Sequence, residues 1–135
     1  MSVLARLRSA SKLDVLDLAE EIRAEATRLV WNTNIVPKGW RDIFAKPMCV
    51  LCHKLYTQIR AANRIWSTTE ELVEKRKAKA QEAIDTLRDI YDLINYLATT
   101  LPVDWNRFDP LLNLMLKEEG KLKNWKDNTK IVKRK

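Results

Sequence analysis

Residues 49–53 read Cys-Val-Leu-Cys-His, the spacing by which a c-type haem is attached to a polypeptide. Haem attachment requires export to an oxidising site, and the basic N-terminus lacks the continuous apolar segment of a secretory signal. Zinc is disfavoured as well, because Cys49, Cys52 and His53 are the only cysteines and histidine in the chain and a structural zinc site takes four ligands. The sequence therefore favours ordinary helical residues here, with no metal and no cofactor, and a haem or redox bundle stays as an alternative.

Other residues that could carry catalysis form no recognisable constellation. The chain has no phosphate-binding glycine loop, no dinucleotide-binding glycine motif and no nucleophile elbow. Adjacent carboxylates, such as Glu20 with Glu21 and Glu118 with Glu119, stand beside lysines or arginines in polar stretches, which is typical of solvated helix faces. We therefore expect a protein that is not an enzyme.

The net charge of +7 is concentrated in two segments. Residues 37–66 hold six basic side chains against one acidic, for +5, and residues 121–135 hold seven against one, for +6. Residues 1–36 are balanced at five and five, and residues 67–120 hold seven basic and eleven acidic side chains, for −4. This asymmetry predicts a polyanionic or acidic partner.

Eleven of the thirteen basic side chains of these two segments are our candidate binding residues for nucleic acid and protein partners. They are Lys38, Arg41, Lys46, Lys54, Arg60, Arg64, Lys126, Lys130, Lys133, Arg134 and Lys135. Lysines and arginines that meet phosphates displace counterions, so such a surface binds nucleic acid with strong salt dependence and little base readout. For the first segment an alternative stays open, in which its cations pair with the acidic third helix of the same molecule.

Apolar periodicity places these residues on helices. Four amphipathic stretches are expected at about 11–31, 41–66, 70–99 and 109–125, and no stretch alternates with period two. Short breaks containing Pro37, Gly39, the Ser-Thr-Thr of 67–69 and Asp109-Pro110 separate them. The pattern predicts an all-α, antiparallel, up-and-down four-helix bundle.

The bundle is expected to span residues 11–126, after an N-terminal extension at 1–10 and before a flexible basic tail at 127–135. No apolar run is long enough to cross a membrane, so we expect no membrane contact and a cytoplasmic location. The five tryptophans lie at or near predicted helix ends, where they either seal the bundle or contribute to a subunit interface.

Three motifs resemble a known family. They are "IVPKGWR" at 35–41, "RAAN" at 60–63 and "EEGKLKNW" at 118–125. With the helix pattern, they are similar to the four-helix-bundle superfamily of accessory variability determinant proteins of diversity-generating retroelements, which also holds proteins encoded in intervening sequences of ribosomal RNA genes. The resemblance covers roughly residues 13–125.

The resemblance implies a function. Members of that family assemble into a homopentameric ring with a basic surface that binds the element's reverse transcriptase and template RNA and supports mutagenic cDNA synthesis. The basic positions that match are Lys38, Arg41, Lys54, Arg60 and Arg64. The alternative is a helical interaction module that binds an acidic protein partner and no nucleic acid.

Overall fold

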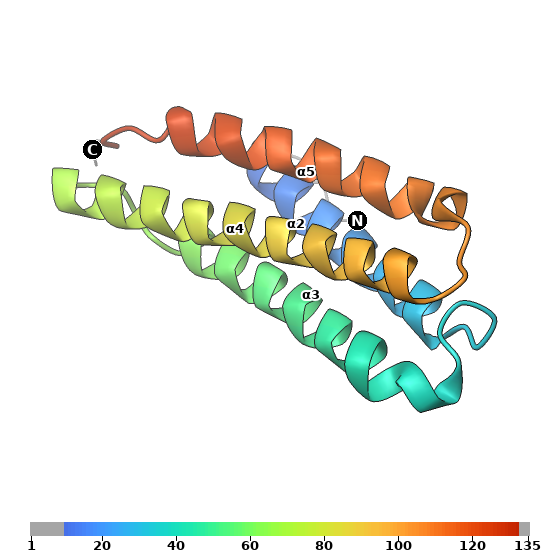
Figure 1. Cartoon of the computed structure of the whole chain (residues 1–135). Helices are drawn as coiled ribbons and strands as arrows, with labels where there is room; N and C mark the ends of the chain where they lie inside the picture. The colour runs from blue at the N-terminus through green and yellow to red at the C-terminus, as the bar shows by residue number, and fades with distance from the viewer. Residues whose placement is uncertain (1–9, 133–135) are drawn as a thin grey trace, which may run out of the picture.

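The structure is a computed structural model that describes the backbone of residues 10–132 and the side chains of residues 15–132. Four long helices are joined by short connections, two of which contain a 3-10 turn (Figure 1). In chain order the elements are α2 (Ala10–Trp31), η1 (Lys38–Trp40), α3 (Arg41–Asn63), α4 (Glu70–Thr100), η2 (Trp105–Phe108) and α5 (Asp109–Asp127). The described part of the chain holds no strand, so the predicted all-α class with four helices is confirmed.

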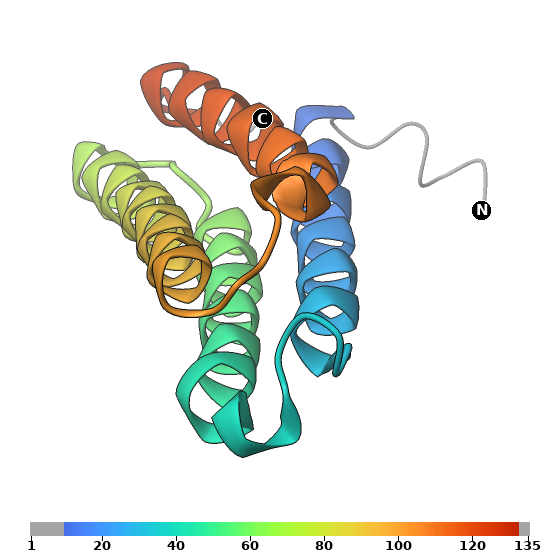
Figure 2. The same ribbon diagram turned by 45° about the vertical axis from the view of Figure 1, so that its right-hand side comes forward.

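The helices pack in a closed cycle. Each helix contacts the next one along the chain, and α5 returns to contact α2. Figure 2 shows the four helices around a common centre, with α3 lying between α2 and α4. This arrangement leaves the far side of α3, together with its borders on α2 and α4, facing outward.

The core is formed by one apolar stripe from each helix. The stripe of α2 is buried along its described length: Val15, Leu18, Ala19, Ile22, Ala26 and Leu29. Phe44 of α3 and Phe108 of η2 are fully buried and are the largest such side chains. Burial of apolar surface stabilises the fold by about 25 cal/mol per Å².

Helix boundaries follow local capping chemistry. The Thr69 hydroxyl accepts a hydrogen bond from the Leu72 amide at 3.2 Å and begins α4. Pro110 lies in the first turn of α5, where a missing N–H is harmless. Pro47 lies inside α3, which begins six residues earlier at Arg41, so this proline does not mark the start of the helix.

The prediction that the second helix reaches residue 66 is wrong. Helix α3 ends at Asn63, and Trp66, the last residue of the predicted helix, is 64% exposed. The chain leaves the helix here because the next residues are engaged elsewhere: Ser67 is buried, and its hydroxyl donates to the carbonyl of Lys130 at 2.8 Å.

The described part of the predicted flexible tail is docked, which corrects that expectation. Thr129 is buried and its hydroxyl donates to the Trp125 carbonyl at 2.8 Å. The Val132 amide donates to the Ser67 carbonyl at 2.8 Å. Segment 128–132 is therefore held against the α3–α4 connection by hydrogen bonds that link residues far apart in sequence, a contact that local periodicity cannot reveal.

Four of the five tryptophans are partly exposed. Trp31, Trp40 and Trp105 are between 37% and 39% exposed, and only Trp125 is buried, at 9%. Trp40 stacks on the buried Phe44 ring with 5.9 Å between the ring centres. Trp40 therefore packs against the end of the core while part of its ring remains exposed to solvent.

Within residues 10–132, none of the helices combines the length and the apolar character that crossing a bilayer requires.

Candidate nucleic-acid interface

Cations and aromatic rings alternate along the border between α2 and α3. The guanidinium carbon of Arg23 lies 4.9 Å from the centre of the Tyr56 ring, and that of Arg60 lies 5.7 Å from the same centre. An Arg23 Nη1 atom lies 3.5 Å from Nδ1 of His53. Tyr56 is thus flanked by two guanidinium groups, which its electron-rich ring face attracts.

A second contact between a guanidinium group and an aromatic ring lies near the α2–α3 turn. The guanidinium carbon of Arg41 lies 4.7 Å from the centre of the Trp31 ring, and Trp31 Nε1 donates to the Cys49 sulfur at 3.4 Å. Trp31 remains 39% exposed, so part of its ring faces solvent. We call the whole row the α2–α3 seam; it comprises Arg23, Trp31, Arg41, Cys49, His53, Tyr56 and Arg60.

Helical spacing explains why these side chains meet. Cys49, His53, Tyr56 and Arg60 follow at intervals of four, three and four residues, which keeps them on one flank of α3. That flank borders the buried stripe, so its members reach α2 without entering the core. Long cationic side chains suit such a border because their stems cover apolar surface while the charged groups reach water.

The predicted cations do not all lie on this flank. At about 100° per residue, Lys54 lies about 120° around α3 from Arg60. Arg64 is the C-cap residue that follows the last residue of α3. Lys54 and Arg64 are exposed, as is Lys38 in η1. Within the described residues, none of these three cations makes an ion pair.

Lys46 differs from the other candidates because it has an acidic neighbour. Its Nζ lies 2.8 Å from a carboxylate oxygen of Asp42, one turn earlier on the same helix. The hydrogen bond and the charge of Lys46 lower the pKa of the Asp42 carboxyl. Both side chains are exposed, so this pair screens Lys46 but adds little to stability.

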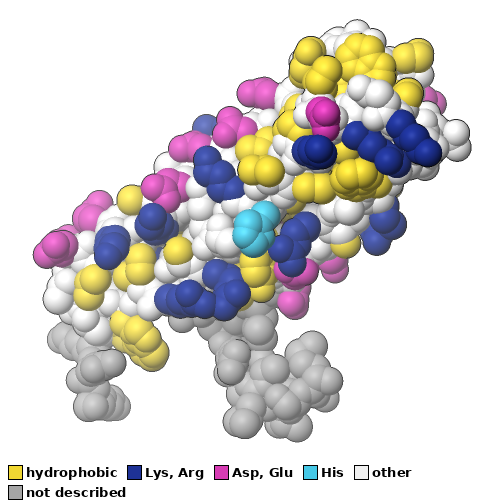
Figure 3. Space-filling model, turned by 90° about the horizontal axis from the view of Figure 1, so that it is seen from below, with side chains coloured by type: hydrophobic (Ala, Val, Ile, Leu, Met, Phe, Trp, Pro, Cys, Tyr) yellow, Lys and Arg dark blue, Asp and Glu magenta, His cyan; other side chains and the backbone are white. Residues whose placement is uncertain are grey.

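The sequence left open that carboxylates of the acidic third helix, α4, neutralise the cations of α3, and the observed ion pairs bear on this alternative. Among the described residues, no ion pair joins α3 to α4. The acidic residues of α4 that form pairs do so with cations of α4 itself, namely Glu82 with Lys79 and Asp85 with Arg88, and Arg88 also reaches Glu119 of α5. Figure 3, which views the molecule from the α3 side, shows Lys and Arg side chains spread along this face, with His53 among them.

The candidate cations near the C-terminus differ in their surroundings. Lys126 Nζ donates to Gln81 Oε1 at 2.7 Å, so this cation is tied to α4. Lys130 is exposed, and its backbone carbonyl accepts from Ser67. The remaining candidates, Lys133, Arg134 and Lys135, lie outside the described residues, as does most of the predicted N-terminal extension.

The side chains of the Cys-Val-Leu-Cys-His stretch lie on different sides of α3. Cys52 is fully buried, and burial raises the pKa of its thiol to about 12, which keeps it protonated and unreactive at neutral pH. Cys49 and His53 belong to the seam instead. Within residues 15–132, no three His, Cys, Asp or Glu side chains lie close enough to hold a metal ion.

Of the seven seam residues, only Arg41 and Arg60 were among the candidates from the sequence; Cys49 and His53 were interpreted as ordinary helical residues, and Arg23, Trp31 and Tyr56 were not proposed as nucleic-acid contacts. Arg23 pairs with Glu20 at 2.6 Å, and in sequence it reads as part of a balanced helix face. Trp31 and Tyr56 carry no charge, so a count of cations does not find them. The signal that could have found Tyr56 is its spacing of three and four residues from His53 and Arg60.

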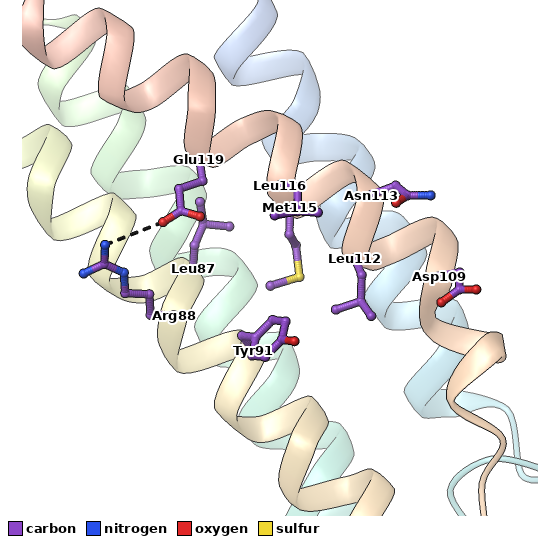
Figure 4. Close-up of a pocket in the computed structure, with 9 residues that line it drawn as sticks. All are labelled: Leu87, Arg88, Tyr91, Asp109, Leu112, Asn113, Met115, Leu116 and Glu119. Carbon is purple, nitrogen blue, oxygen red and sulfur yellow. Dashed lines mark ion pairs between the residues drawn. The ribbon is translucent and has the colours of Figure 1, made fainter.

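A groove between α4 and α5 is a second surface feature (Figure 4). It encloses about 450 Å³, and Leu116 and Tyr91 on its walls are 67% and 51% exposed. The Arg88–Glu119 ion pair, at 3.6 Å, bridges the two helices at one end. Unlike the α3 face, this groove is mainly apolar, and its charged residues are of both signs.

Comparisons of the chain with protein-family models, with curated proteins and with solved structures each give no match.

Proposed function

We propose that this protein binds RNA through the α2–α3 seam and the exposed cations of α3, as a non-enzymatic accessory subunit of the reverse transcriptase of a diversity-generating retroelement. The observation that supports the RNA-binding part is that no described ion pair links the cations of α3 to the acids of α4. Cations left without local carboxylates are available to phosphates.

The mechanism combines two kinds of contact. Arg60, Arg64 and Lys54 neutralise phosphates and release their counterions, which supplies affinity without reading sequence. The exposed part of the Trp31 ring offers a surface on which a base can stack, a contact open only to unpaired bases. The seam is therefore suited to single-stranded RNA, and to the cDNA copied from it.

The retroelement part of the proposal rests on the resemblance of residues 35–41, 60–63 and 118–125 to the accessory proteins of these elements. In this role the chain performs no chemistry. It holds the template RNA and the polymerase together, in the cytoplasm, and the basic face serves both partners.

Co-purification tests this role. When the chain is co-expressed with the reverse transcriptase encoded beside its own gene, we expect it to be retained on the tagged polymerase and to be required for mutagenic cDNA synthesis. Absence of such a polymerase gene, or cDNA synthesis that is unaffected when the chain is omitted, would contradict the retroelement role and leave RNA binding to be judged separately.

We further propose that the four helices run up and down in antiparallel order and that copies of the bundle form a ring, a homopentamer by the resemblance. A ring repeats a weak basic face several times, which raises avidity for a long polyanion. Contacts between copies in a ring are head-to-tail, and the α4–α5 groove is a suitable half of such a contact because its mixed charges do not repel a second copy.

Replacing Leu116 by Glu should convert the oligomer to a monomer, because the side chain is 67% exposed in one copy and a carboxylate resists burial in an apolar contact. Light scattering should report a multiple of the 15.8 kDa chain mass for the unchanged protein and about one chain for the variant. A monomeric unchanged protein rules out the ring, and an oligomer that tolerates L116E places its contact elsewhere.

A helical module that binds an acidic protein is the second candidate. It is favoured by apolar side chains on the basic face: Val50 is 66% exposed and Ile43 is 43% exposed. Val50 lies one turn from Lys54, so a cation and an apolar side chain are adjacent. This candidate predicts retention of an acidic protein on the chain after nuclease treatment, together with no measurable affinity for RNA.

A further inference from the structure

Arg76 of α4 is a buried cation without a counterion in the described part of the molecule. The side chain is 8% exposed and lies over the Trp125 ring, with 4.7 Å from its guanidinium carbon to the ring centre. Its Nε is buried and makes no hydrogen bond, and the guanidinium forms no ion pair with any described residue. A guanidinium in this state is costly, because burial removes its hydration without replacing it.

Arg76 lines a cavity of about 180 Å³ where α3 ends, α4 begins and the C-terminal segment docks. The other lining residues are Asn63, Ile65, Trp66, Ser67 and Val132. The Oδ1 atom of Asn63 is also buried without a hydrogen-bond partner among described residues. Two buried polar groups around one small cavity therefore lack partners.

The walls of this cavity are fixed by the structure around it. Ser67 donates to the Lys130 carbonyl and Val132 donates to the Ser67 carbonyl, both at 2.8 Å, so the C-terminal segment is held across the α3–α4 connection. The guanidinium also lies over the Trp125 ring. A guanidinium held in this way loses little freedom when it binds an anion through two parallel hydrogen bonds.

We propose that this cavity binds a carboxylate group carried on an apolar body, with the carboxylate against Arg76 and the apolar part against Ile65 and Val132. A carboxylate carries one negative charge, which a single guanidinium neutralises. A phosphate monoester carries up to two charges at neutral pH, and in this site it would keep one of them uncompensated. Burial also lowers the pKa of Arg76, which agrees with a guanidinium that lacks a counter-charge.

This site goes beyond the proposed RNA-binding function and does not depend on it. The carboxylate can come from the end of a peptide chain or from a small free acid. N-acetyl-leucine imitates a chain end with an apolar side chain, and acetate imitates a small acid. N-acetyl-leucine amide is the matched probe that lacks the charge, and inorganic phosphate tests the competing anion.

Titration of the unchanged protein with these four probes, followed by amide chemical shifts, is the first part of the experiment. N-acetyl-leucine should shift the signals of residues 63–67 and 132, whereas its amide and inorganic phosphate should leave them in place. Acetate should bind the same residues with an affinity about tenfold lower, since it lacks the apolar contact. Equal responses to N-acetyl-leucine and its amide, or a stronger response to phosphate, would overturn the proposal.

Replacing Arg76 by Met is the second part, with Arg107→Met as its control. Arg107 is exposed in η2, so this change removes the same charge without touching the cavity. Without ligand, R76M should melt about 3–6 °C above the unchanged protein, because an uncompensated buried cation is replaced by an apolar side chain. N-acetyl-leucine should stabilise the unchanged protein and R107M but not R76M.

Replacing Arg76 by Lys keeps the charge and loses the two-pronged geometry. This variant should retain the fold and bind N-acetyl-leucine about tenfold more weakly. A purely structural role for Arg76 gives a different pattern: R76M would melt below the unchanged protein, and N-acetyl-leucine would affect none of the proteins. That pattern would refute the carboxylate site.

Discussion

Replacing Arg60 and Arg64 together by glutamate is expected to weaken RNA binding by about 100-fold at roughly 100 mM salt. Each substitution removes a phosphate contact and adds a repulsive charge, which together reduce affinity by about tenfold per site. Both residues are exposed, and Arg64 follows Arg60 by four residues at the end of α3, so one strand can contact both. Fluorescence anisotropy with a labelled single-stranded RNA of about 30 nucleotides measures the change.

The matched control is the double variant Arg107→Glu with Lys117→Glu. It changes the net charge by the same amount, and both residues are exposed and lie outside α3. Its RNA affinity should stay within about threefold of the unchanged protein. Equal losses in both double variants would show that only total charge matters, and full affinity in the Arg60 and Arg64 variant would place the interface on another face.

Replacing Phe44 by alanine should lower the free energy of unfolding by about 3–5 kcal/mol, the largest loss we expect from a single substitution. Phe44 is fully buried, and its ring centre lies 5.9 Å from that of Trp40 and 5.0 Å from that of Tyr96. Truncation would leave a cavity at the end of the bundle and release both partner rings. Urea denaturation measures this loss, with the dependence of the unfolding free energy on urea concentration held the same for both proteins.

Val50→Ala is the control for this prediction, because Val50 lies on the same helix but is 66% exposed. Its effect should be within about 0.5 kcal/mol. A loss below about 1 kcal/mol for F44A would mean that this end of the core is not packed as described.

The fold could largely be predicted from the sequence because its information is local. The stripe from Val15 to Leu29 repeats with helical period, and each of its predicted core residues is buried. Thr69, which begins α4, is a good capping residue by type alone. Periodicity and caps thus locate helices, since both depend on residues within a few positions of one another.

The predictions that failed depend on contacts between distant segments. Trp66 continues the apolar spacing of α3, yet it lies beyond the end of the helix because Ser67 bonds to Lys130. Residues 128–132 have no apolar period, and only their hydrogen bonds to Trp125 and Ser67 show that they are docked. Sequence periodicity contains no information about such partners.

Some features of the candidate site could likewise be predicted from the sequence, and others could not. The excess of positive charge in 37–66 is a property of composition and could be counted. The meeting of Arg23 with Tyr56, by contrast, requires the register of α2 against α3, which a single sequence does not specify. Arg76 lies among buried residues of α4, and only the structure shows that no described carboxylate accompanies it there.

The salt dependence of RNA binding by the unchanged protein tests the central claim most directly. Because a single strand releases about 0.7 counterions for each phosphate neutralised, four or more contacts predict a slope of about −3 or steeper in log affinity against log salt. Anisotropy titrations between about 50 and 300 mM salt would measure this slope. A slope near zero, or no binding at the lowest salt, would contradict a phosphate-binding face on α3.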